Sequence, residues 1–386
     1  MVHAPRSQGD ARSGRLVETS VAGERVRAFV PPPLPPDPPL VLLPLLPRLS
    51  SADRALGRLD GLAQLLPDPH IFLYAYVRKE ALLSSQIEGT QSTLTDLFVL
   101  EAGEETAARF DDVQEVSNYV AAMQHGMARL AELPISLRLI REMHEMLLRH
   151  GRGAGKQPGE FRTSQNWIGG SRPGNAMFVP PPPDKVLPCL ADLEAFLHGD
   201  NDLPPLIRAG LAHVQFETIH PFLDGNGRVG RLLITLMLCS AGVLRQPLLY
   251  LSLFFKSRRD DYYRLLQEVR DHGAWEAWLD FFLEGVEQTA GSAVDSAQRI
   301  IALFDEDRAS IEQRADRAGS VLRVHEQLKR KPLLSQKAAS AATGLSPATV
   351  NAAFSALRRL GIVNEITGRA RNRLYVYGRY LAILGD

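Results

Sequence analysis

The stretch His220-Pro-Phe-Leu-Asp-Gly-Asn-Gly-Arg-Val-Gly-Arg231 decides the fold and the chemistry that we predict for this chain. An apolar helical pattern ends at the proline, small residues form a turn, and a second helix opens with two arginines. Gly225 and Gly227 allow positive φ and close approach of a ligand, and the free N–H groups at a helix start bind anions. The turn therefore predicts a nest for phosphate.

The charged residues of this stretch extend the prediction to a polyphosphate and a metal ion. Arg228 and Arg231 are three residues apart, so they share a helix face and can both grip phosphate oxygens. Asp224 would repel an anion unless a cation lay between them, which implies Mg²⁺ held by this carboxylate, phosphate oxygens and water. His220, whose unperturbed pKa is about 6.5, is a suitable base for a hydroxyl. The combination indicates phosphoryl or nucleotidyl transfer.

Length and composition indicate a folded protein of several domains. At about 150 residues per domain, 386 residues predict two or three domains. The 45% of hydrophobic and 23% of charged residues argue against a disordered chain, and 44 basic residues balance 44 acidic ones. Cys189 and Cys239 form no Cys-x-x-Cys pair, and no stretch resembles a signal peptide or a membrane span. We therefore expect a reduced, cytoplasmic protein without a membrane partner.

Hydrophobic periodicity predicts a mainly α-helical protein with five regions. These are an N-terminal arm with the proline-rich run 31–39 (1–50), an N-terminal helical region (51–136), a central helical core (137–290), a connecting helix (291–319) and a small C-terminal domain (320–386). Within the core, helices are expected over 184–198, 206–219, 227–241 and onward to about 315. Two β-prone pieces, 166–168 and 177–179, flank a Gly/Pro-rich turn and predict a β-hairpin.

The C-terminal region differs from the rest of the chain in charge. Residues 320–386 carry eleven Lys and Arg against three Asp and Glu. Helices expected over 321–329, 335–342 and 347–360, followed by strands over 362–367 and 373–377, have the order of a winged helix-turn-helix. In that interpretation the third helix reads the major groove, and the wing residues Arg369, Arg371 and Arg373 contact DNA phosphates. The alternative is an interaction or dimerisation module whose arginines are solvated.

The central stretch matches the signature of the Fic family, His-Pro-Phe-x-Asp/Glu-Gly-Asn-Gly-Arg-x-x-Arg, at every fixed position. The chain therefore resembles Fic proteins, which implies a Fic-type helical bundle over roughly 137–287, with a β-hairpin flap between Trp167 and Val179. The resemblance implies transfer of AMP from ATP to a Ser, Thr or Tyr hydroxyl of a protein, with release of pyrophosphate. The flap would receive the target segment as an added strand.

The resemblance also implies a role for each motif residue. His220 would be the general base and Asp224 the Mg²⁺ ligand. The phosphate-binding residues would be Gly225, Asn226, Gly227, Arg228 and Arg231, with Arg231 on the γ-phosphate. Tyr262 and Tyr263 match a Tyr-Tyr-x-x-Leu pattern near the adenine site of related proteins, with core packing as the alternative. His213, seven residues before His220, is expected to be structural.

A second motif, Ser84-Ser-Gln-Ile-Glu88-Gly89, ends a helix that is expected to begin near His70. The pattern Ser/Thr-x-x-x-Glu-Gly/Asn is common by chance, but N-terminal to a Fic core it resembles an inhibitory helix. Glu88 would pair with Arg231 and repel the γ-phosphate, so ATP would bind in a non-productive pose. Gly89 suits a helix C-cap. The alternative is that Glu88 is a solvated carboxylate at a helix end.

These observations predict a self-inhibited protein adenylyltransferase that uses ATP and Mg²⁺ and modifies proteins, itself included. Two alternatives stay open. One is a DNA-binding regulator in which the Fic core senses a nucleotide. The other is a Fic enzyme with a different chemistry, such as UMP or phosphocholine transfer or removal of AMP from a modified protein. The sequence leaves open whether the chain forms a homodimer.

Overall fold

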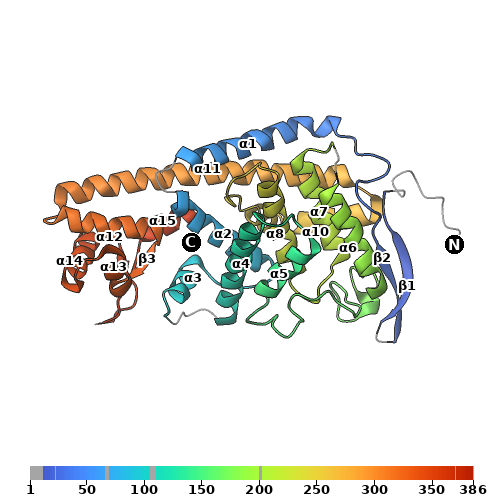
Figure 1. Cartoon of the computed structure of the whole chain (residues 1–386), viewed down its shortest axis with the longest axis horizontal. Coiled ribbons are helices and arrows are strands. Elements are labelled where there is room, and N and C mark those ends of the chain that lie inside the picture. Colours follow the sequence, from blue (N-terminus) through green and yellow to red (C-terminus); the bar gives the residue numbers. More distant parts are fainter. Residues whose placement is uncertain are drawn as a thin grey trace.

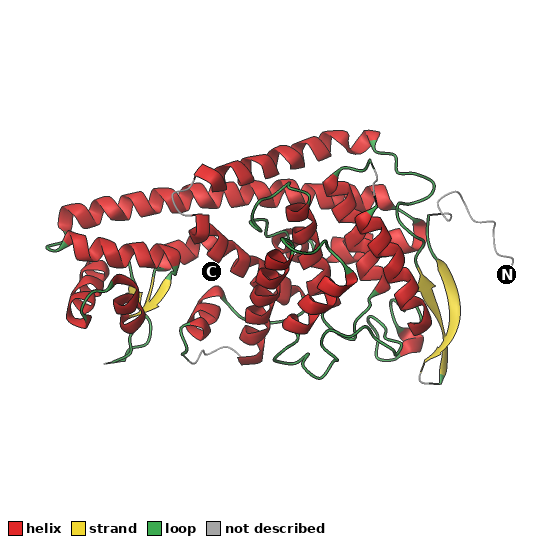
Figure 2. Ribbon diagram, viewed as in Figure 1, coloured by secondary structure: helices red, strands yellow, loops and turns green. Residues whose placement is uncertain are grey.

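The computed structural model describes residues 12–21, 23–65, 69–104, 110–199, 202–369 and 371–385. Helices dominate these ranges, and the molecule is elongated along its longest helix (Figures 1 and 2). Among the described residues, no helix has both the length and the apolar character that a membrane span requires. The mainly α-helical class expected from the sequence is confirmed.

The N-terminal segment begins with a β-hairpin that the sequence analysis did not predict. Strand β1 (Arg15–Val21) pairs antiparallel with β2 (Glu24–Val30), and their turn contains Gly23 with a φ of +84°. The proline-rich run that follows forms neither helix nor strand, because proline fixes φ and lacks an N–H donor. A short 3₁₀ turn, η2 (Leu43–Leu45), then leads into the first helix.

Eleven helices of the described chain build the N-terminal helical region and the core. They are α1 (Leu46–Leu65), α2 (Pro69–Ile87), α3 (Leu94–Glu101), α4 (Phe110–Arg129), α5 (Leu137–Leu147), α6 (Pro183–His198), α7 (Pro205–Ile219), α8 (Asn226–Ser240), α9 (Ser252–Ser257), α10 (Arg259–His272) and α11 (Trp275–Arg314). Helix α11 is 40 residues long, and α1 lies along it (Figure 1). Helices α7 and α8 pack against each other in the centre, where nearly all their side chains are buried.

The segment between α5 and α6 contains the expected hairpin only in reduced form. Its two arms meet in a single antiparallel bridge between Ile168 and Phe178, around a short 3₁₀ turn, η3 (Pro173–Asn175). Gly169 and Gly170 both have positive φ, so the arm leaves the extended conformation directly after the bridge. We call residues 167–179 the flap.

The C-terminal region is a winged helix, as the sequence predicts. It consists of α12 (Ala318–Arg330), β3 (Leu333–Ser335), α13 (Gln336–Thr343), α14 (Pro347–Arg359), β4 (Asn364–Glu365), β5 (Leu374–Val376) and α15 (Gly378–Leu384). The strands form an antiparallel sheet in the order β3-β5-β4. This domain lies beneath the distal end of α11, at the opposite end of the molecule from the β1–β2 hairpin (Figure 1). The expected connecting helix is the distal half of α11, which continues without a break to Arg314.

Candidate active site

The loop between α7 and α8 carries the central motif and has a well-defined shape. Helix α7 ends at His220 in a left-handed conformation (φ +48°), and Gly225 caps the start of α8 with a φ of +79°. The Asn226 side chain accepts a hydrogen bond from the Phe222 N–H at 2.8 Å and donates one to the Phe222 carbonyl at 2.9 Å. Asn226 therefore closes the loop with its side chain, while the first N–H groups of α8 have no partner within the helix.

The environment of His220 keeps its imidazole neutral. Burial and the nearby guanidinium groups of Arg270 and Arg162 lower its pKa to about 3. Its Nδ1 atom is buried and has no hydrogen-bond partner among the described residues. A neutral imidazole can accept a proton, which is what a general base requires.

Two arginines of α8 point from the loop into the core. Arg228 donates to Glu115 of α4 at 2.9 Å, and both side chains are buried. Arg228 also lies 3.4 Å from Asp224. The sequence analysis missed Glu115, although an acidic residue within the apolar stripe of its helix is a recognisable signal. The Arg228–Glu115 pair fixes one guanidinium beside the predicted phosphate nest.

The second arginine, Arg231, is bound by the Ser84–Gly89 motif. Its side chain is 2% exposed, and it donates to the Glu88 carboxylate at 2.7 Å, to the Ser84 hydroxyl at 2.8 Å and to the Ser84 carbonyl at 3.0 Å. A Cβ atom at Gly227 would collide with Oε1 of Glu88, so this carboxylate lies directly over the first turn of α8. Gly89 has a φ of +100° after the end of α2.

The charge of Glu88 is stabilised by this contact. Burial alone would raise the pKa of Glu88, but the Arg231 guanidinium outweighs burial and lowers the pKa below its usual value. The side chain is 34% exposed, yet it is paired rather than freely solvated. A carboxylate at this position faces the group that is expected to bind the γ-phosphate.

Asp224 has the properties expected of a single carboxylate ligand for Mg²⁺. One of its oxygens accepts the Gly225 N–H at 2.6 Å, and its side chain is 41% exposed. Within the described ranges, no group of three or more His, Cys, Asp or Glu side chains could hold a metal ion. Mg²⁺ is commonly held by one or two carboxylates together with substrate phosphates and water, so this donor set fits that ion.

The two expected adenine-side tyrosines differ in their environment. Tyr262 is buried, and its hydroxyl lies 2.8 Å from Nε2 of His213, whose Nδ1 lies 3.0 Å from the Gly230 carbonyl. Tyr262 and His213 therefore belong to the core. Tyr263 is 40% exposed, and burial together with the nearby Glu88 charge raises the pKa of its hydroxyl. Of the two rings, Tyr263 is the one that a ligand can reach.

The wing arginines have different partners. Arg369 forms an ion pair with Glu104, which follows α3, at 2.7 Å, and Arg373 donates to the Arg369 carbonyl. Arg371 is exposed, as are Asn351 and Ser355 on α14. Side chains of α14 are therefore exposed to solvent, whereas one wing arginine, Arg369, is paired with the N-terminal helical region.

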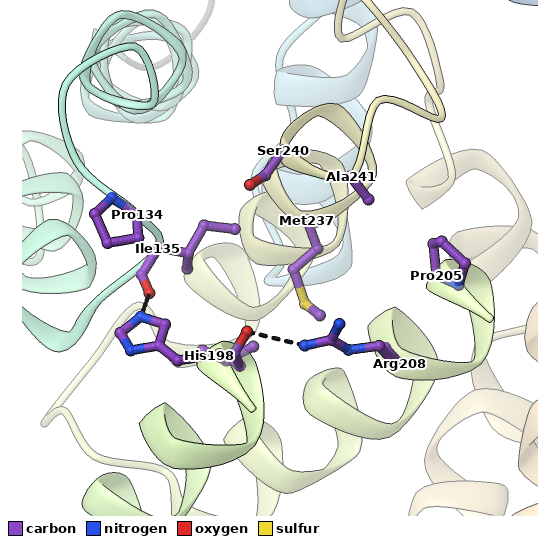
Figure 3. A pocket seen from close by; sticks show the side chains of 9 residues that line it. Pro134, Ile135, His198, Pro205, Arg208, Met237, Ser240 and Ala241 are labelled. Atoms are coloured by element: carbon purple, nitrogen blue, oxygen red, sulfur yellow. Dashed lines mark hydrogen bonds between the residues drawn. The ribbon is translucent and has the colours of Figure 1, made fainter. Parts of the chain in front are cut away.

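A separate cavity of about 210 Å³ lies at the other end of α8 and contains none of the predicted site residues. Figure 3 shows its lining, which includes His198, Arg208, Met237 and Ser240. Arg208 donates to the Leu197 carbonyl at 2.9 Å and so caps the end of α6. This cavity is remote from the motif loop, which opens at the start of α8.

Comparisons with known proteins agree with this geometry. Residues 46–128 match the Fic/DOC family N-terminal region, residues 134–238 match the Fic/DOC family, and residues 320–364 match a winged helix-turn-helix DNA-binding domain. The protein adenylyltransferase Fic of Drosophila grimshawi is 32% identical over 208 residues, which are 53% of this chain and 40% of that protein. The corresponding protein of Drosophila mojavensis is also 32% identical over 208 residues, covering 53% and 38%. The chain thus spans about 40% of the length of these curated relatives.

Solved structures support the fold. A Fic family protein from Desulfovibrio desulfuricans G20 superimposes with a TM-score of 0.59 at 21% identity, covering 88% of this chain and 97% of that one. A Fic domain containing signaling protein from Bacteroides thetaiotaomicron VPI-5482 gives a TM-score of 0.52 at 20% identity, covering 64% and 97%. The matched regions, and a motif that agrees with the family signature at every fixed position, show that this chain belongs to the Fic/DOC family and carries a winged helix-turn-helix at its C-terminal end.

Proposed function

We propose that this chain is a self-inhibited protein adenylyltransferase. It transfers AMP from ATP to a Ser, Thr or Tyr hydroxyl of a protein, its own chain included, and releases pyrophosphate. The observation that carries this proposal is the 2.7 Å contact between Arg231 and Glu88, which lies over the first turn of α8. The names of the Drosophila relatives support the same activity.

Each residue of the loop between α7 and α8 would have a separate role in the reaction. The N–H groups that follow Gly225 and the buried Arg228 would bind the phosphate chain. Asp224 would hold Mg²⁺, whose charge would offset that of the phosphates. The neutral His220 would take the proton of the attacking hydroxyl as its oxygen forms a bond to the α-phosphorus. The bond between the α-phosphorus and the bridging oxygen then breaks, and pyrophosphate leaves with the bonding electrons.

The proposed inhibition acts on the position of ATP rather than on the base. Arg231 cannot pair with the γ-phosphate while Glu88 and Ser84 occupy its donors. The carboxylate would also repel the terminal phosphate across the nest. ATP would therefore bind with its α-phosphorus away from His220.

Mass spectrometry of the Glu88→Gly protein incubated with ATP and Mg²⁺ tests the proposal. We expect added adenylate on this variant and much less on the parent chain. The matched control is Glu88→Gly combined with His220→Ala, which keeps the nest but lacks the base and should remain unmodified. If the Glu88→Gly protein gains no adenylate from ATP but is modified by a UMP or phosphocholine donor, the activity is a different transfer.

We also infer that the winged helix binds duplex DNA through α14. The family match over 320–364 and the exposed Asn351 and Ser355 support this second function. DNA binding through wing arginines should weaken steeply as salt is raised, and Arg371→Ala should reduce that slope. Salt-insensitive self-association, with no retention of duplex DNA, would instead identify the domain as a dimerisation module.

A further inference from the structure

Arg162, which precedes the flap, is a buried guanidinium that binds backbone carbonyls only. It donates to the His220 carbonyl at 2.9 Å and to the Ile219 carbonyl at 3.3 Å, at the C-terminal end of α7. It also donates to the carbonyls of Ser164 at 3.2 Å and Pro181 at 2.6 Å, which lie on either side of the flap. One side chain therefore ties both ends of the flap to the residue that carries the catalytic imidazole.

Arg270 of α10 makes a similar connection from the other side. Its guanidinium donates to the Thr218 hydroxyl at 3.2 Å and to the Glu217 carbonyl at 3.4 Å, again in the last turn of α7. Its Cζ atom lies 3.9 Å from the centroid of the Phe178 ring, which is the bridge residue of the flap. Arg270 thus stacks on the flap while it caps α7.

Both guanidiniums are buried, and no ion pair closer than 4 Å is found for either one among the described residues. Carbonyl oxygens and the negative end of the α7 dipole offset their charges, and the Glu217 carboxylate also acts on Arg270 at longer range. Burial lowers the pKa of each to about 10, so both remain charged at neutral pH. Burying a charge without a close ionic partner is costly, and each of these two guanidiniums also contacts the flap, which an ordinary helix cap does not require.

We propose that Arg162 and Arg270 are positioning residues that hold His220 and the flap at a fixed distance and orientation for adenylate transfer. The proposal rests on the proposed function, in which His220 is the base and the flap presents the target hydroxyl. Two rigid connections between them set the distance from the imidazole to the attacking oxygen. A displacement of about 1 Å at such a distance can reduce the rate by roughly 100-fold.

The two positive charges have a second consequence for the imidazole. The charged groups that face His220 are Arg270 from α10, Arg162 from the loop before the flap and Glu88 from the end of α2, and the Glu217 carbonyl adds its own dipole. The two guanidiniums oppose protonation of the ring, whereas Glu88 favours it. Removal of one guanidinium should therefore make the ring easier to protonate.

Kinetics in the Glu88→Gly background test the proposal. Arg162→Gln and Arg270→Gln should lower kcat on the order of 100-fold, with little change in the KM for ATP, because the phosphate nest is intact. The acid limb of the pH profile for Arg270→Gln should move up by roughly one unit. Arg270→Lys should retain the charge and so keep the acid limb in place, although it loses the stacking on Phe178.

Arg208→Gln is the matched control. Arg208 also caps a helix through carbonyls, but it lies beside the cavity of Figure 3, away from His220. It should lower stability without changing kcat or the pH profile. Equal effects of the Arg208 and Arg162 variants on kcat, or an unshifted acid limb in Arg270→Gln, would overturn the positioning role.

A readout that needs no activity separates this proposal from the proposed function. Nuclear magnetic resonance of the His220 ring reports its pKa in the resting protein, and the value should rise in Arg270→Gln and Arg162→Gln but not in Arg208→Gln. If the ring pKa rises but the Glu88→Gly chain never transfers adenylate, the two arginines do act on His220 and it is the assigned reaction that is wrong. If Glu88→Gly is active and its ring pKa and kcat are insensitive to both arginines, the positioning is wrong and the reaction stands.

Discussion

Replacement of Glu88 by Gln separates the charge of this side chain from its bulk. The Gln variant keeps nearly the same shape over Gly227 but loses the ion pair with Arg231. A hydrogen bond to a charged group contributes about 1.5–3 kcal/mol. Because the Glu88 side chain is 34% exposed, solvent screening reduces this to about 1–2 kcal/mol. Such a difference corresponds to about a 5–30-fold change in the population that can bind ATP productively.

The assay is the initial rate of adenylate incorporation at ATP concentrations below saturation. We expect Glu88→Gln to exceed the parent by about 5–30-fold and Glu88→Gly to exceed it further, because Gly also clears the space over the first turn of α8. A Gln variant as inactive as the parent, beside an active Gly variant, would refute the electrostatic reasoning and assign the inhibition to bulk alone.

Three further predictions concern pH and the flap. Since Arg231 holds the pKa of Glu88 below its usual value, this carboxylate stays ionised from about pH 5.5 to 8, and the parent chain should incorporate little adenylate anywhere in that range. Burial raises the pKa of Glu80 to about 7, so the stability that it contributes is present below the usual pKa of glutamate and is lost as pH rises through 7. Thermal unfolding should accordingly show that Glu80→Gln raises Tm at pH 8 but not at pH 5; a gain of equal size at both values would contradict this. Glu24 of β2 accepts hydrogen bonds from the Arg172 side chain at 2.8 Å and from the Gly174 N–H at 3.0 Å. Glu24→Ala should therefore increase hydrogen exchange in the flap while lowering the free energy of unfolding by only about 1 kcal/mol. Unchanged exchange in the flap would show that the β1–β2 hairpin does not stabilise it.

The sequence predicted the features that depend on local chemistry. A proline, two glycines and an asparagine where two helical patterns meet define the turn before any tertiary contact is known. The winged helix could also be predicted from the sequence, because its order of helices and strands and its positive charge are local properties. The pairing of Glu88 with Arg231 was predictable only through the resemblance to a family, since 143 residues separate them in the chain.

The features that were missed depend on contacts distant in sequence. Strands β1 and β2 alternate polar and apolar residues around Gly23, but the sequence analysis assigned this polar segment to an N-terminal arm. Their apolar face is buried only because Val26 and Ala28 pack against Val179 of the flap. Likewise, Arg162 is indistinguishable from a surface arginine until the carbonyls of α7 and of the flap surround it.

The contacts of α2 indicate how the inhibition can be relieved. Upstream of Ser84, this helix is held by buried polar groups: the Tyr76 hydroxyl donates to the Ala293 carbonyl at 2.7 Å, and Glu80 accepts from the Ser252 N–H at 3.0 Å. Displacement of the whole helix would leave such groups unpaired, at a cost of about 1–3 kcal/mol each.

Movement of Glu88 at the end of this turn breaks fewer contacts, because Ile87, which stays buried in the core, need not move. The pair between Glu88 and Arg231 is worth about 1–2 kcal/mol, and an incoming γ-phosphate would replace the carboxylate as the partner of the guanidinium. Gly89, with a φ of +100°, lets the chain change direction directly behind Glu88. We therefore expect release by local opening at Glu88 and Gly89, with Ile87 and the rest of α2 in place. Hydrogen exchange on the Glu88→Gln protein should increase in this segment and stay unchanged around Tyr76; increased exchange along the entire helix would show that α2 leaves as a unit.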